Sequence, residues 1–515
     1  KLDAETKASY DIWVYEYERN LADQKFVDNR YIFTQMQGVQ VFLANFMINF
    51  HKVEDEAQML AYNKRIGGVG RAIGQLLEQA QANADKGVRP PRFAYTKVIE
   101  EASNLVTGAP FTADAKDAPL WADAKRKAGS LVEKQAITQA RADEILAQTK
   151  ATLLSDFNPA YQALITWFKA DFNNTDEIAR GVGQLPNGAA YYNHKLQENT
   201  TTQLSADEIH QLGLSEVARI RGEMEAIKRK VGFKGNLQEF FKFIKTDEQF
   251  FYPNDDSGRT GYIEDTEAYL GVINQTLPQY FGILPKADLV VKRVEAFREQ
   301  PGAAQHYYPG TPDGSRPGIY YAHLSDMGAM PKNEMEGVAY HEGNPGHHMQ
   351  ISIAQELTSV PQFRTQAGFT AYSEGWGLYA ELLALEMGAY QDDYSNFGRL
   401  VNEMWRAVRL VVDTGLHAKG WTEMQAVAYF MDNTPIAEDA IRSEVQRYLV
   451  IPGQATAYKI GMLKILELRK TAKQALGDKF DIRGFHDTIL GGGAMPLGIL
   501  ERRVNTWVET VKAQG

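Results

Sequence analysis

The feature that most constrains the fold of this 515-residue chain is its helical periodicity. Apolar and aromatic residues recur every three or four positions, as in Tyr10, Trp13 and Tyr17, and this spacing places them on one face of a helix. The segments with this pattern are 9–37, 39–50, 54–85, 92–105, 118–148, 149–169, 236–245, 265–277, 366–387, 394–418, 422–432, 437–449, 456–476 and 497–512. The pattern predicts a mainly α-helical protein.

One helix start is marked by its capping residues. Ser205 is followed three positions later by Glu208, the spacing of a capping box in which the two residues satisfy each other's backbone N–H groups. We therefore expect a helix that begins after Ser205 and extends to Lys230.

The pattern changes between about residues 286 and 323. The segments 289–294, 304–308 and 318–324 are rich in β-branched and aromatic residues, and a turn-rich stretch of residues 309–317 separates the last two. Such short runs bounded by turn residues are typical of strands. We expect a small antiparallel β-sheet here, just before the next helix.

A histidine-rich motif follows the predicted sheet. His341, His347 and His348 fall within eight positions, Glu342 comes directly after the first histidine, and Glu374 is expected on a later helix. A His-Glu pair, a further histidine and a downstream glutamate are the components of a hydrolytic zinc centre. The sequence therefore predicts a metal site.

The spacing within the motif does not suit a regular helix. The common pattern places two histidines at i and i+4, whereas His347 is at i+6 and His348 at i+7 from His341. In a helix, i+6 lies about 120° away from the first residue and i+7 about 10.5 Å along the axis. Pro345 cannot donate a helical hydrogen bond, and a bulge of two residues at this point would let His347 take the i+4 role. The residues leave both histidines open as the second ligand.

Composition excludes several classes of function and ligand. The net charge is −10 and the basic residues are dispersed among acidic ones, which argues against nucleic acid as a partner. The chain has no cysteine, so a metal must take imidazole and carboxylate ligands, which suits zinc, manganese or iron. The longest apolar run, residues 41–50, is far shorter than a transmembrane span of about 20 residues.

Four motifs resemble a large bacterial family, domain-of-unknown-function family 885. They are His-Glu-Gly-Asn-Pro-Gly-His-His from residue 341, Glu-Gly-Trp-Gly-Leu-Tyr-Ala-Glu from residue 374, Asp-Thr-Gly-Leu-His from residue 413 and Pro-Gly-Gln-Ala-Thr-Ala-Tyr-Lys from residue 452. Further similar segments lie near both ends of the chain, so the resemblance covers nearly all of it. Families of this type are grouped with the helical gluzincins, which include oligopeptidases, angiotensin-converting-enzyme-like enzymes and thermostable carboxypeptidases.

The resemblance implies a fold and a set of metal ligands. Those relatives have a large helical two-lobed body around a deep channel, with one zinc ion per chain. For this sequence it implies an N-terminal helical lobe of residues 1–285 and a catalytic lobe of residues 286–515, intertwined as one structural unit. It also implies His341 and His347 as zinc ligands, Glu374 as the third ligand and Glu342 as general base. His348 stays open as the alternative to His347.

The resemblance also suggests residues that act on the substrate. Relatives stabilise the oxyanion with a tyrosine from a late helix, a position that Tyr458 occupies here, with Tyr448 as the alternative. His417 lies four residues after Asp413, so the two can pair along a helix face and assist catalysis. In relatives an edge strand pairs with the peptide backbone, a role for residues 319–324. The residues expected to bind substrate are Tyr320, Tyr321, His323, Tyr448, Arg447 and Lys459.

Together these observations predict a zinc-dependent peptidase of oligopeptides. A zinc hydrolase of another amide or an ester has the same ligand set, and a non-catalytic peptide-binding relative would keep the fold. The sequence starts at Lys1 without a signal-like segment and lacks cysteine. We expect a periplasmic or secreted protein, possible as a lipoprotein whose signal is removed, with a cytoplasmic location as the alternative.

Overall fold

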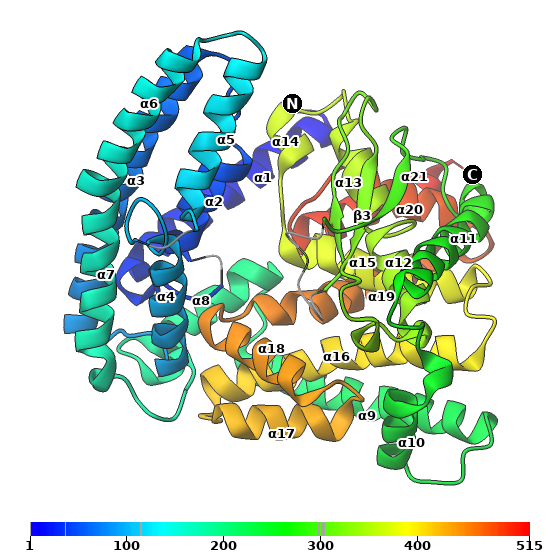
Figure 1. The fold of residues 1–515 in the computed structure, drawn as a ribbon. Helices are drawn as coiled ribbons and strands as arrows, with labels where there is room; N and C mark the ends of the chain where they lie inside the picture. The colour runs from blue at the N-terminus through cyan, green and yellow to red at the C-terminus, as the bar shows by residue number, and fades with distance from the viewer. Residues whose placement is uncertain (1, 37, 114–115, 296–298, 300–303, 515) are drawn as a thin grey trace. The chain divides into compact units, whose positions relative to one another are not determined.

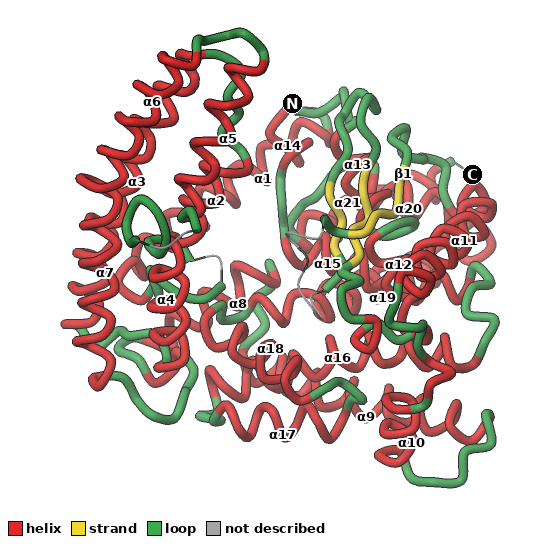
Figure 2. Tube along the Cα trace, in the orientation of Figure 1, coloured by secondary structure: helices red, strands yellow, loops and turns green. Residues whose placement is uncertain are grey.

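The protein is described by a computed structural model that covers residues 2–36, 38–113, 116–295, 299 and 304–514. It is mainly helical with one small sheet, which confirms the predicted fold class (Figures 1 and 2). The helices are α1 Ala4–Asp23, α2 Val39–Asn49, α3 Glu56–Asp85, α4 Arg92–Leu105, α5 Pro119–Glu133, α6 Gln139–Thr152, α7 Asn158–Asp171, α8 Gly188–Thr200, α9 Ala206–Lys230, α10 Leu237–Thr246, α11 Asp256–Tyr280, α12 Lys332–Glu342, α13 His347–Gln355, α14 Gln362–Gln366, α15 Thr370–Glu386, α16 Asp393–Ala418, α17 Glu423–Asn433, α18 Glu438–Val450, α19 Ala457–Leu476, α20 Ile482–Leu490 and α21 Leu497–Ala513. The strands are β1 Leu289–Arg293, β2 His306–Tyr308 and β3 Gly318–Ala322.

The chain divides into two compact units. The first consists of Lys1–Gln24, Ala190–Tyr448 and Pro452–Gly515, and the second of Lys25–Ala189 and Leu449–Ile451. The boundary expected at residues 285 and 286 therefore falls inside the first unit. Within the described residues, no helix combines the length and apolar character needed to cross a bilayer.

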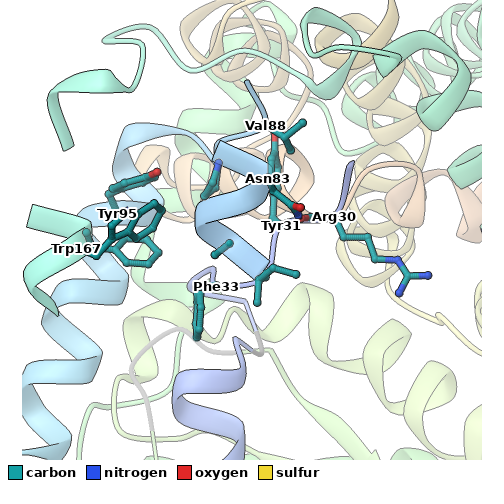
Figure 3. Close-up of a pocket in the computed structure, with 11 residues that line it drawn as sticks. Arg30, Tyr31, Phe33, Asn83, Val88, Tyr95 and Trp167 are labelled. Carbon is teal, nitrogen blue, oxygen red and sulfur yellow. The ribbon is translucent and has the colours of Figure 1, made fainter. Parts of the chain in front are cut away.

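The second unit is a helical bundle with its own core. Its helices α3, α5, α6 and α7 run side by side (Figure 1) around buried side chains such as Tyr62, Tyr95 and Phe157. The unit has a small pocket of aromatic, aliphatic and polar residues, which include Arg30, Tyr31, Phe33, Asn83, Val88, Tyr95 and Trp167 (Figure 3). None of the site residues predicted from the sequence lines this pocket.

The first unit is built around α16. This helix packs against α9, α12 and α17, and α15 packs against α19. Two glycines make the second contact unusually close, because a Cβ atom on Gly375 would lie 2.5 Å from the Cα atom of Gly461. Helices α15 and α16 both pack against α12, which carries His341 and Glu342.

The sheet belongs to the first unit and is mixed rather than wholly antiparallel. The strand order is β1-β3-β2, with β3 parallel to β1 and antiparallel to β2. The central strand β3 places Tyr320 and Ala322 in the core, where α11 and α12 cover them. Strand periodicity indicates which residues alternate between faces, but it does not indicate which strands pair.

Several helix boundaries follow the predicted capping signals. Ser205 and Glu208 form the expected capping box at the start of α9. The predicted helix 118–148 is instead two helices, α5 and α6, because Gln135 adopts a left-handed φ of 57° and Thr138 caps α6. Helix α8 was not expected from the sequence, since it lacks a clear apolar stripe.

Candidate metal centre

The histidine motif spans two helices rather than one helix with a bulge. Helix α12 ends at Glu342 and α13 begins at His347. Between them, Gly346 has no room for a side chain, since a Cβ atom there would lie 2.0 Å from the carbonyl oxygen of His341. The prediction of a bulge within one continuous helix is therefore wrong. The chain stops its first helix at the Gly343–Gly346 turn and restarts, and this turn brings His347 back towards His341.

Three side chains from α12, α13 and α15 converge at this break. The Nε2 atom of His341 lies 3.5 Å from Glu374 Oε2, and the Nε2 atom of His347 lies 3.4 Å from the same oxygen. The two imidazole rings are 4.7 Å apart between centroids and nearly perpendicular. Glu342 joins the group, since His341, His347 and Glu342 each offer a ligand atom within 4.8 Å of the others.

The distances fit a tetrahedral metal ion better than direct hydrogen bonds. Ligand atoms bound at about 2.0–2.1 Å to one tetrahedral ion lie about 3.3–3.4 Å apart, close to the observed 3.4 and 3.5 Å. An N–H···O hydrogen bond is shorter, about 2.7–3.2 Å. Two imidazole nitrogens and one carboxylate oxygen are also the donor set that zinc accepts in catalytic sites. The residues present therefore fit a zinc ion.

Glu381 orients the first histidine. Its Oε1 atom lies 2.8 Å from His341 Nδ1, and both side chains are buried. Because this carboxylate accepts the Nδ1 proton, the lone pair of Nε2 faces Glu374 and His347, the arrangement found at metal-bound histidines. The Nδ1 atom of His347 is buried but has no partner among the described residues.

The protein packs tightly around these ligands. Helix α15 passes directly beside His341, so that a Cβ atom on Gly377 would lie 2.8 Å from the imidazole Cε1 atom. The indole Nε1–H of Trp376 donates to the carbonyl oxygen of Pro345 at 2.8 Å. One helix therefore provides the Glu374 carboxylate, the space for the His341 ring and an anchor for the turn.

The site favours positive charge. Burial lowers the pKa of His341, but the carboxylates of Glu374 and Glu381 outweigh burial and raise this pKa to about 9. Burial raises the pKa of Glu374, but His341 and His347 outweigh it and hold the pKa well below its usual range. The carboxylates thus stabilise a cation at this point, either a proton or a metal ion.

His348 does not face the site. Its Nε2 atom lies 3.0 Å from the carbonyl oxygen of Ala287, and its Nδ1 atom lies 3.1 Å from the Tyr307 hydroxyl. Burial lowers the pKa of His348 to about 4, so it stays neutral and ties α13 to the start of the sheet. Of the two alternatives, the structure brings His347 to the other ligands.

Tyr458 lies beside the convergent residues. It is half-buried at the start of α19, three residues before the contact between Gly461 and Gly375. Burial and the charge of Glu374 raise its pKa. The Arg409 guanidinium carbon lies 4.6 Å from the centre of its ring. The hydroxyl therefore stays protonated at neutral pH and can act as a hydrogen-bond donor.

Tyr448 and Arg447 flank Tyr458 but have protein partners. The Tyr448 hydroxyl accepts from Arg409 Nε at 2.9 Å and donates to Glu444 Oε2 at 2.7 Å. Arg447 donates to Glu444 at 2.9 Å and to Gln454 Oε1 at 2.6 Å. Both side chains position charged groups near Tyr458, and Tyr448 is completely buried.

Two predicted site residues have structural positions instead. His417 is buried, with its Nε2 atom 3.0 Å from the carbonyl oxygen of Tyr448, so it supports α18 rather than facing the metal ligands. Asp413 accepts from Tyr192 at 2.6 Å and from the backbone N–H of Gly453 at 3.1 Å. It thereby anchors the turn that precedes α19.

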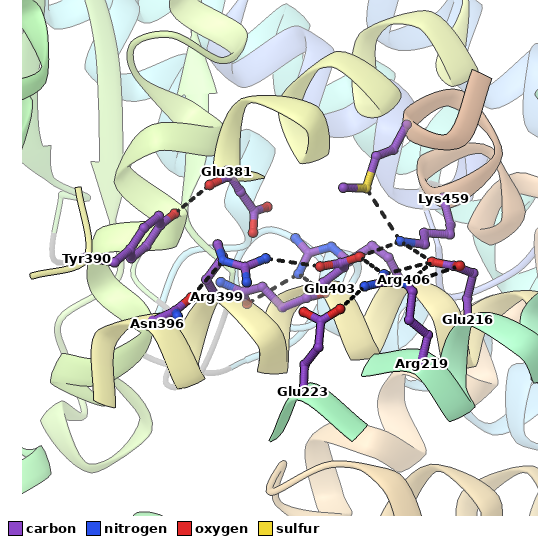
Figure 4. A network of polar contacts seen from close by, with 12 residues as sticks. Glu216, Arg219, Glu223, Glu381, Tyr390, Asn396, Arg399, Glu403, Arg406 and Lys459 are labelled. Atoms are coloured by element: carbon purple, nitrogen blue, oxygen red, sulfur yellow. Dashed lines mark hydrogen bonds and ion pairs between the residues drawn. The ribbon is translucent and has the colours of Figure 1, made fainter. Parts of the chain in front are cut away.

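Lys459 is likewise not available to a substrate. It is fully buried, with its Nζ atom 2.6 Å from Glu403 Oε1 and 2.9 Å from Glu216 Oε2 (Figure 4). Its sequence position next to Tyr458 suggested a substrate contact, but consecutive residues on a helix point about 100° apart. Lys459 therefore points into the contact between α19, α16 and α9.

The sheet residues are divided between two faces. Tyr320 is fully buried, its hydroxyl 3.2 Å from that of Tyr262. Burial raises the pKa of Tyr320, and Tyr262 and the charge of Glu342 add to this effect. Tyr321 points the other way and stacks on His306 at 5.4 Å between ring centres, and His323 lies 5.6 Å from His306. The alternation is as predicted, but β3 has a neighbour on both sides and is not an edge strand. A peptide cannot pair with it, so the predicted backbone pairing through residues 319–324 is wrong.

Sequence reasoning missed two arginines on α16. Arg406 and Arg409 both lie over the Tyr458 ring, at 5.9 and 4.6 Å from its centre. The signal was their spacing of three residues between apolar residues of one helix, with Trp405 beside them. Such basic residues on a buried helix face need an explanation, because buried charges are rare without a partner.

Comparisons with known proteins cover nearly the whole chain. The family described as "Bacterial protein of unknown function (DUF885)" matches residues 1–504. A crystal structure described as a putative lipoprotein from Colwellia psychrerythraea has a TM-score of 0.85 and 34% identity, over 94% of this chain and 81% of that one. A putative lipoprotein of unknown function from Shewanella oneidensis has a TM-score of 0.72 and 18% identity, over 97% and 88% of the two chains, and shows the shared fold. No curated protein matches the chain.

Proposed function

This chain belongs to the bacterial family of unknown function DUF885, and we propose that it is a zinc-dependent peptidase that hydrolyses oligopeptides. The observation that carries the proposal is the convergence of His341, His347 and Glu374 at distances of 3.4–3.5 Å, with Glu342 beside them. These are the ligands and the general base of a hydrolytic metal site. The resemblance to helical gluzincins, which are zinc peptidases, supports the same activity.

The residues of the site have distinct roles in this proposal. His341, His347 and Glu374 would hold one zinc ion, and Glu381 fixes the His341 ring through its contact of 2.8 Å. When bound, such an ion lowers the pKa of a coordinated water towards neutrality and polarises the carbonyl of the scissile bond. Glu342 accepts the proton from the attacking water and passes it to the leaving amine.

Tyr458 completes the site as a hydrogen-bond donor. Its pKa is raised by burial and by Glu374, so its hydroxyl keeps its proton at neutral pH. The hydroxyl donates to the oxygen that gains negative charge as the tetrahedral intermediate forms. Arg409, 4.6 Å from the ring centre, limits how the ring can move.

Access and location belong to the same proposal. We infer from the resemblance to helical oligopeptidases that the substrates are short peptides. We also infer that the protein is exported, since the Colwellia psychrerythraea relative is described as a putative lipoprotein. Export would give it access to peptides outside the cytoplasm.

The test is the substitution Glu342→Gln, which keeps the shape of the side chain but removes the base. We expect the variant to bind one zinc ion per chain and to cleave a peptide library at least about a hundredfold more slowly than the unmodified protein. Zinc would be measured by elemental analysis and cleavage by mass spectrometry. Glu267→Gln, an exposed residue on α11, is the control and should leave both quantities unchanged.

Three outcomes would contradict the assignment. Full peptidase activity in the zinc-loaded Glu342→Gln protein would exclude Glu342 as the base. Cleavage of esters or non-peptide amides, with no peptide cleaved, would assign the same site to another hydrolase. Peptide binding without cleavage of any compound would indicate a binding protein that keeps the fold.

A further inference from the structure

Three arginines near Tyr458 form a cluster with too little negative charge. We call Arg406, Arg409 and Arg447 the arginine cluster. Among the described residues, Arg409 and Arg447 form ion pairs with the same carboxylate, that of Glu444. Its Oε2 atom lies 3.0 Å from Arg409 Nη2 and 2.9 Å from Arg447 Nη2. Arg406 makes no ion pair with the described carboxylates.

Two of these side chains have unused hydrogen-bond donors. Arg409 is only 6% exposed, and its Nη1 atom is buried without a partner among the described residues. Arg406 donates through Nη1 to the backbone and side-chain oxygens of Asn402 at 3.2 and 3.3 Å, but its buried Nε atom has no such partner. Burying charged donors without acceptors costs free energy, so this arrangement favours the binding of an anion.

The arginine cluster lies next to the proposed zinc site. Helices α12 and α16 pack side by side in the same direction, because Gly398 contacts Asn333 and, one turn later, Asn402 contacts Gly337. One turn further along both helices, the Cα position of Arg406 is level with His341, and its guanidinium reaches back to Asn402. Figure 4 shows Arg406 on this stretch of α16, beside the Glu403–Lys459 pair.

Tyr458 lies between the arginine cluster and the proposed zinc ligands. Its ring lies 5.9 Å from the Arg406 guanidinium carbon and 4.6 Å from that of Arg409. The charge of Glu374, one of the proposed zinc ligands, also acts on Tyr458 and raises its pKa together with burial. A substrate whose scissile bond is at the zinc ligands would therefore have a neighbouring part at the arginine cluster.

We propose that Arg406 and Arg409 bind a carboxylate of the substrate, next to the bond that is cleaved. The inference rests on the proposed peptidase function, because it assigns a position to one end of a peptide. Guanidinium groups match the planar geometry of a carboxylate and stay charged at every working pH. The carboxylate is either the free C-terminus of the peptide, which would make the enzyme a carboxypeptidase, or an acidic side chain.

Binding to the zinc-loaded Glu342→Gln protein tests the proposal without relying on turnover. The probes, measured by calorimetry, are N-acetyl-Ala-Ala-Phe as free acid, the same peptide as C-terminal amide, and N-acetyl-Ala-Glu-Phe amide. We expect a peptide with a carboxylate to bind at least about tenfold more tightly than the neutral amide. If only the free acid gains affinity, the carboxylate is the C-terminus. If the glutamate-containing amide gains it, the carboxylate is a side chain.

Substitutions test whether the arginines cause the tighter binding of the carboxylate peptides. Arg406→Gln should remove most of the difference between acid and amide while leaving affinity for the neutral amide unchanged. Arg406→Lys keeps the positive charge but lacks the planar guanidinium, and it should retain part of the difference in affinity between acid and amide. Arg442→Gln is the matched control, because Arg442 lies partly exposed on α18 and pairs with Glu438 at 3.0 Å. A melting temperature for each variant excludes loss of fold as the cause.

The proposal is overturned if the neutral amide binds as tightly as both carboxylate peptides, if none of the peptides binds, or if the preference survives both Arg406→Gln and Arg409→Gln. Its failure is distinguishable from failure of the proposed function. If the unmodified protein cleaves the neutral amide as fast as it cleaves both carboxylate peptides, the protein is a peptidase and the carboxylate site is rejected. Arginine-dependent binding of the carboxylate peptides without any cleavage would keep the carboxylate site and reject the peptidase function.

Discussion

At the scale of single residues, the two histidines after Pro345 show how different adjacent positions become. His347 points its Nε2 atom at Glu374, 3.4 Å away, whereas both nitrogens of His348 are engaged with Ala287 and Tyr307. The sequence singled out the four residues that the structure brings together, because this combination of His and Glu is typical of metal motifs. It could not choose between His347 and His348, since the choice depends on the geometry of a turn.

Glu381 offers a test at the same scale. Removing its charge by Glu381→Gln weakens the contact of 2.8 Å with His341 Nδ1 and allows the imidazole to turn or change tautomer. We expect zinc affinity to fall about 10–100-fold, the usual effect of removing a partner of a metal-bound histidine. Competition with a chromophoric chelator would measure it. Unchanged affinity would show that Glu381 does not orient the ligand.

At the scale of elements, the site depends on how closely helices approach one another. The glycines Gly375, Gly377 and Gly461 allow α15 to contact both α19 and the His341 ring. The sequence predicted α15, α16 and α19 as helices but could not show which of them touch. It also could not show that β3 lies between β1 and β2, because strand pairing is a property of the fold rather than of a strand.

Gly377→Ala tests the helix contact. A Cβ atom at this position would lie 2.8–3.1 Å from three atoms of the His341 ring, so the ring must shift while the helix itself tolerates alanine well. We expect weaker zinc binding and a helical circular dichroism spectrum that does not change. Gly222→Ala on α9 is the control, because a Cβ atom there meets no atom within 4 Å. It should leave zinc binding unchanged and stabilise the fold by up to about 1 kcal/mol. Equal zinc affinity in both variants would contradict the account.

At the scale of the whole molecule, buried histidines link stability to pH. Burial lowers the pKa of His417 to about 4 and that of His486 to about 3. His486 is held neutral between Tyr379 and the carbonyl oxygen of Tyr280, at 2.8 and 2.9 Å. Because their folded pKa values lie below the ordinary value of 6.5, the unfolded chain binds more protons as the pH falls, and folding loses stability.

The stabilisation from these two histidines is complete above pH 6.5 and is lost as the pH falls towards their folded pKa values. We expect each to contribute a slope on the order of 1.4 kcal/mol per pH unit in this range. Denaturant unfolding of His417→Gln between pH 7 and pH 4.5 should show a shallower decline in the free energy of unfolding than the unmodified protein. A decline of equal slope would mean that His417 does not titrate on unfolding.

The overall class of fold was predictable, but the organisation of the chain was not. Helical periodicity is local and can be read from residue spacing, so the mainly helical class followed directly. The division into units depends on contacts between distant segments: residues 1–24 belong with residues 190–448, although residues 25–189 lie between them in the sequence. Arg406 and Arg409 were missed for the same reason, since only the fold brings these residues of α16 to Arg447 on α18.

The central claim is that His347, and not His348, completes a zinc site with His341 and Glu374. The most direct test is zinc stoichiometry and affinity, measured by elemental analysis and chelator competition on the unmodified protein, His347→Gln and His348→Gln. We predict one zinc ion per chain in the unmodified and His348→Gln proteins, and a loss of at least about a hundredfold in affinity in His347→Gln. Stoichiometric, tight zinc binding that survives His347→Gln, or no zinc binding by the unmodified protein, would contradict it.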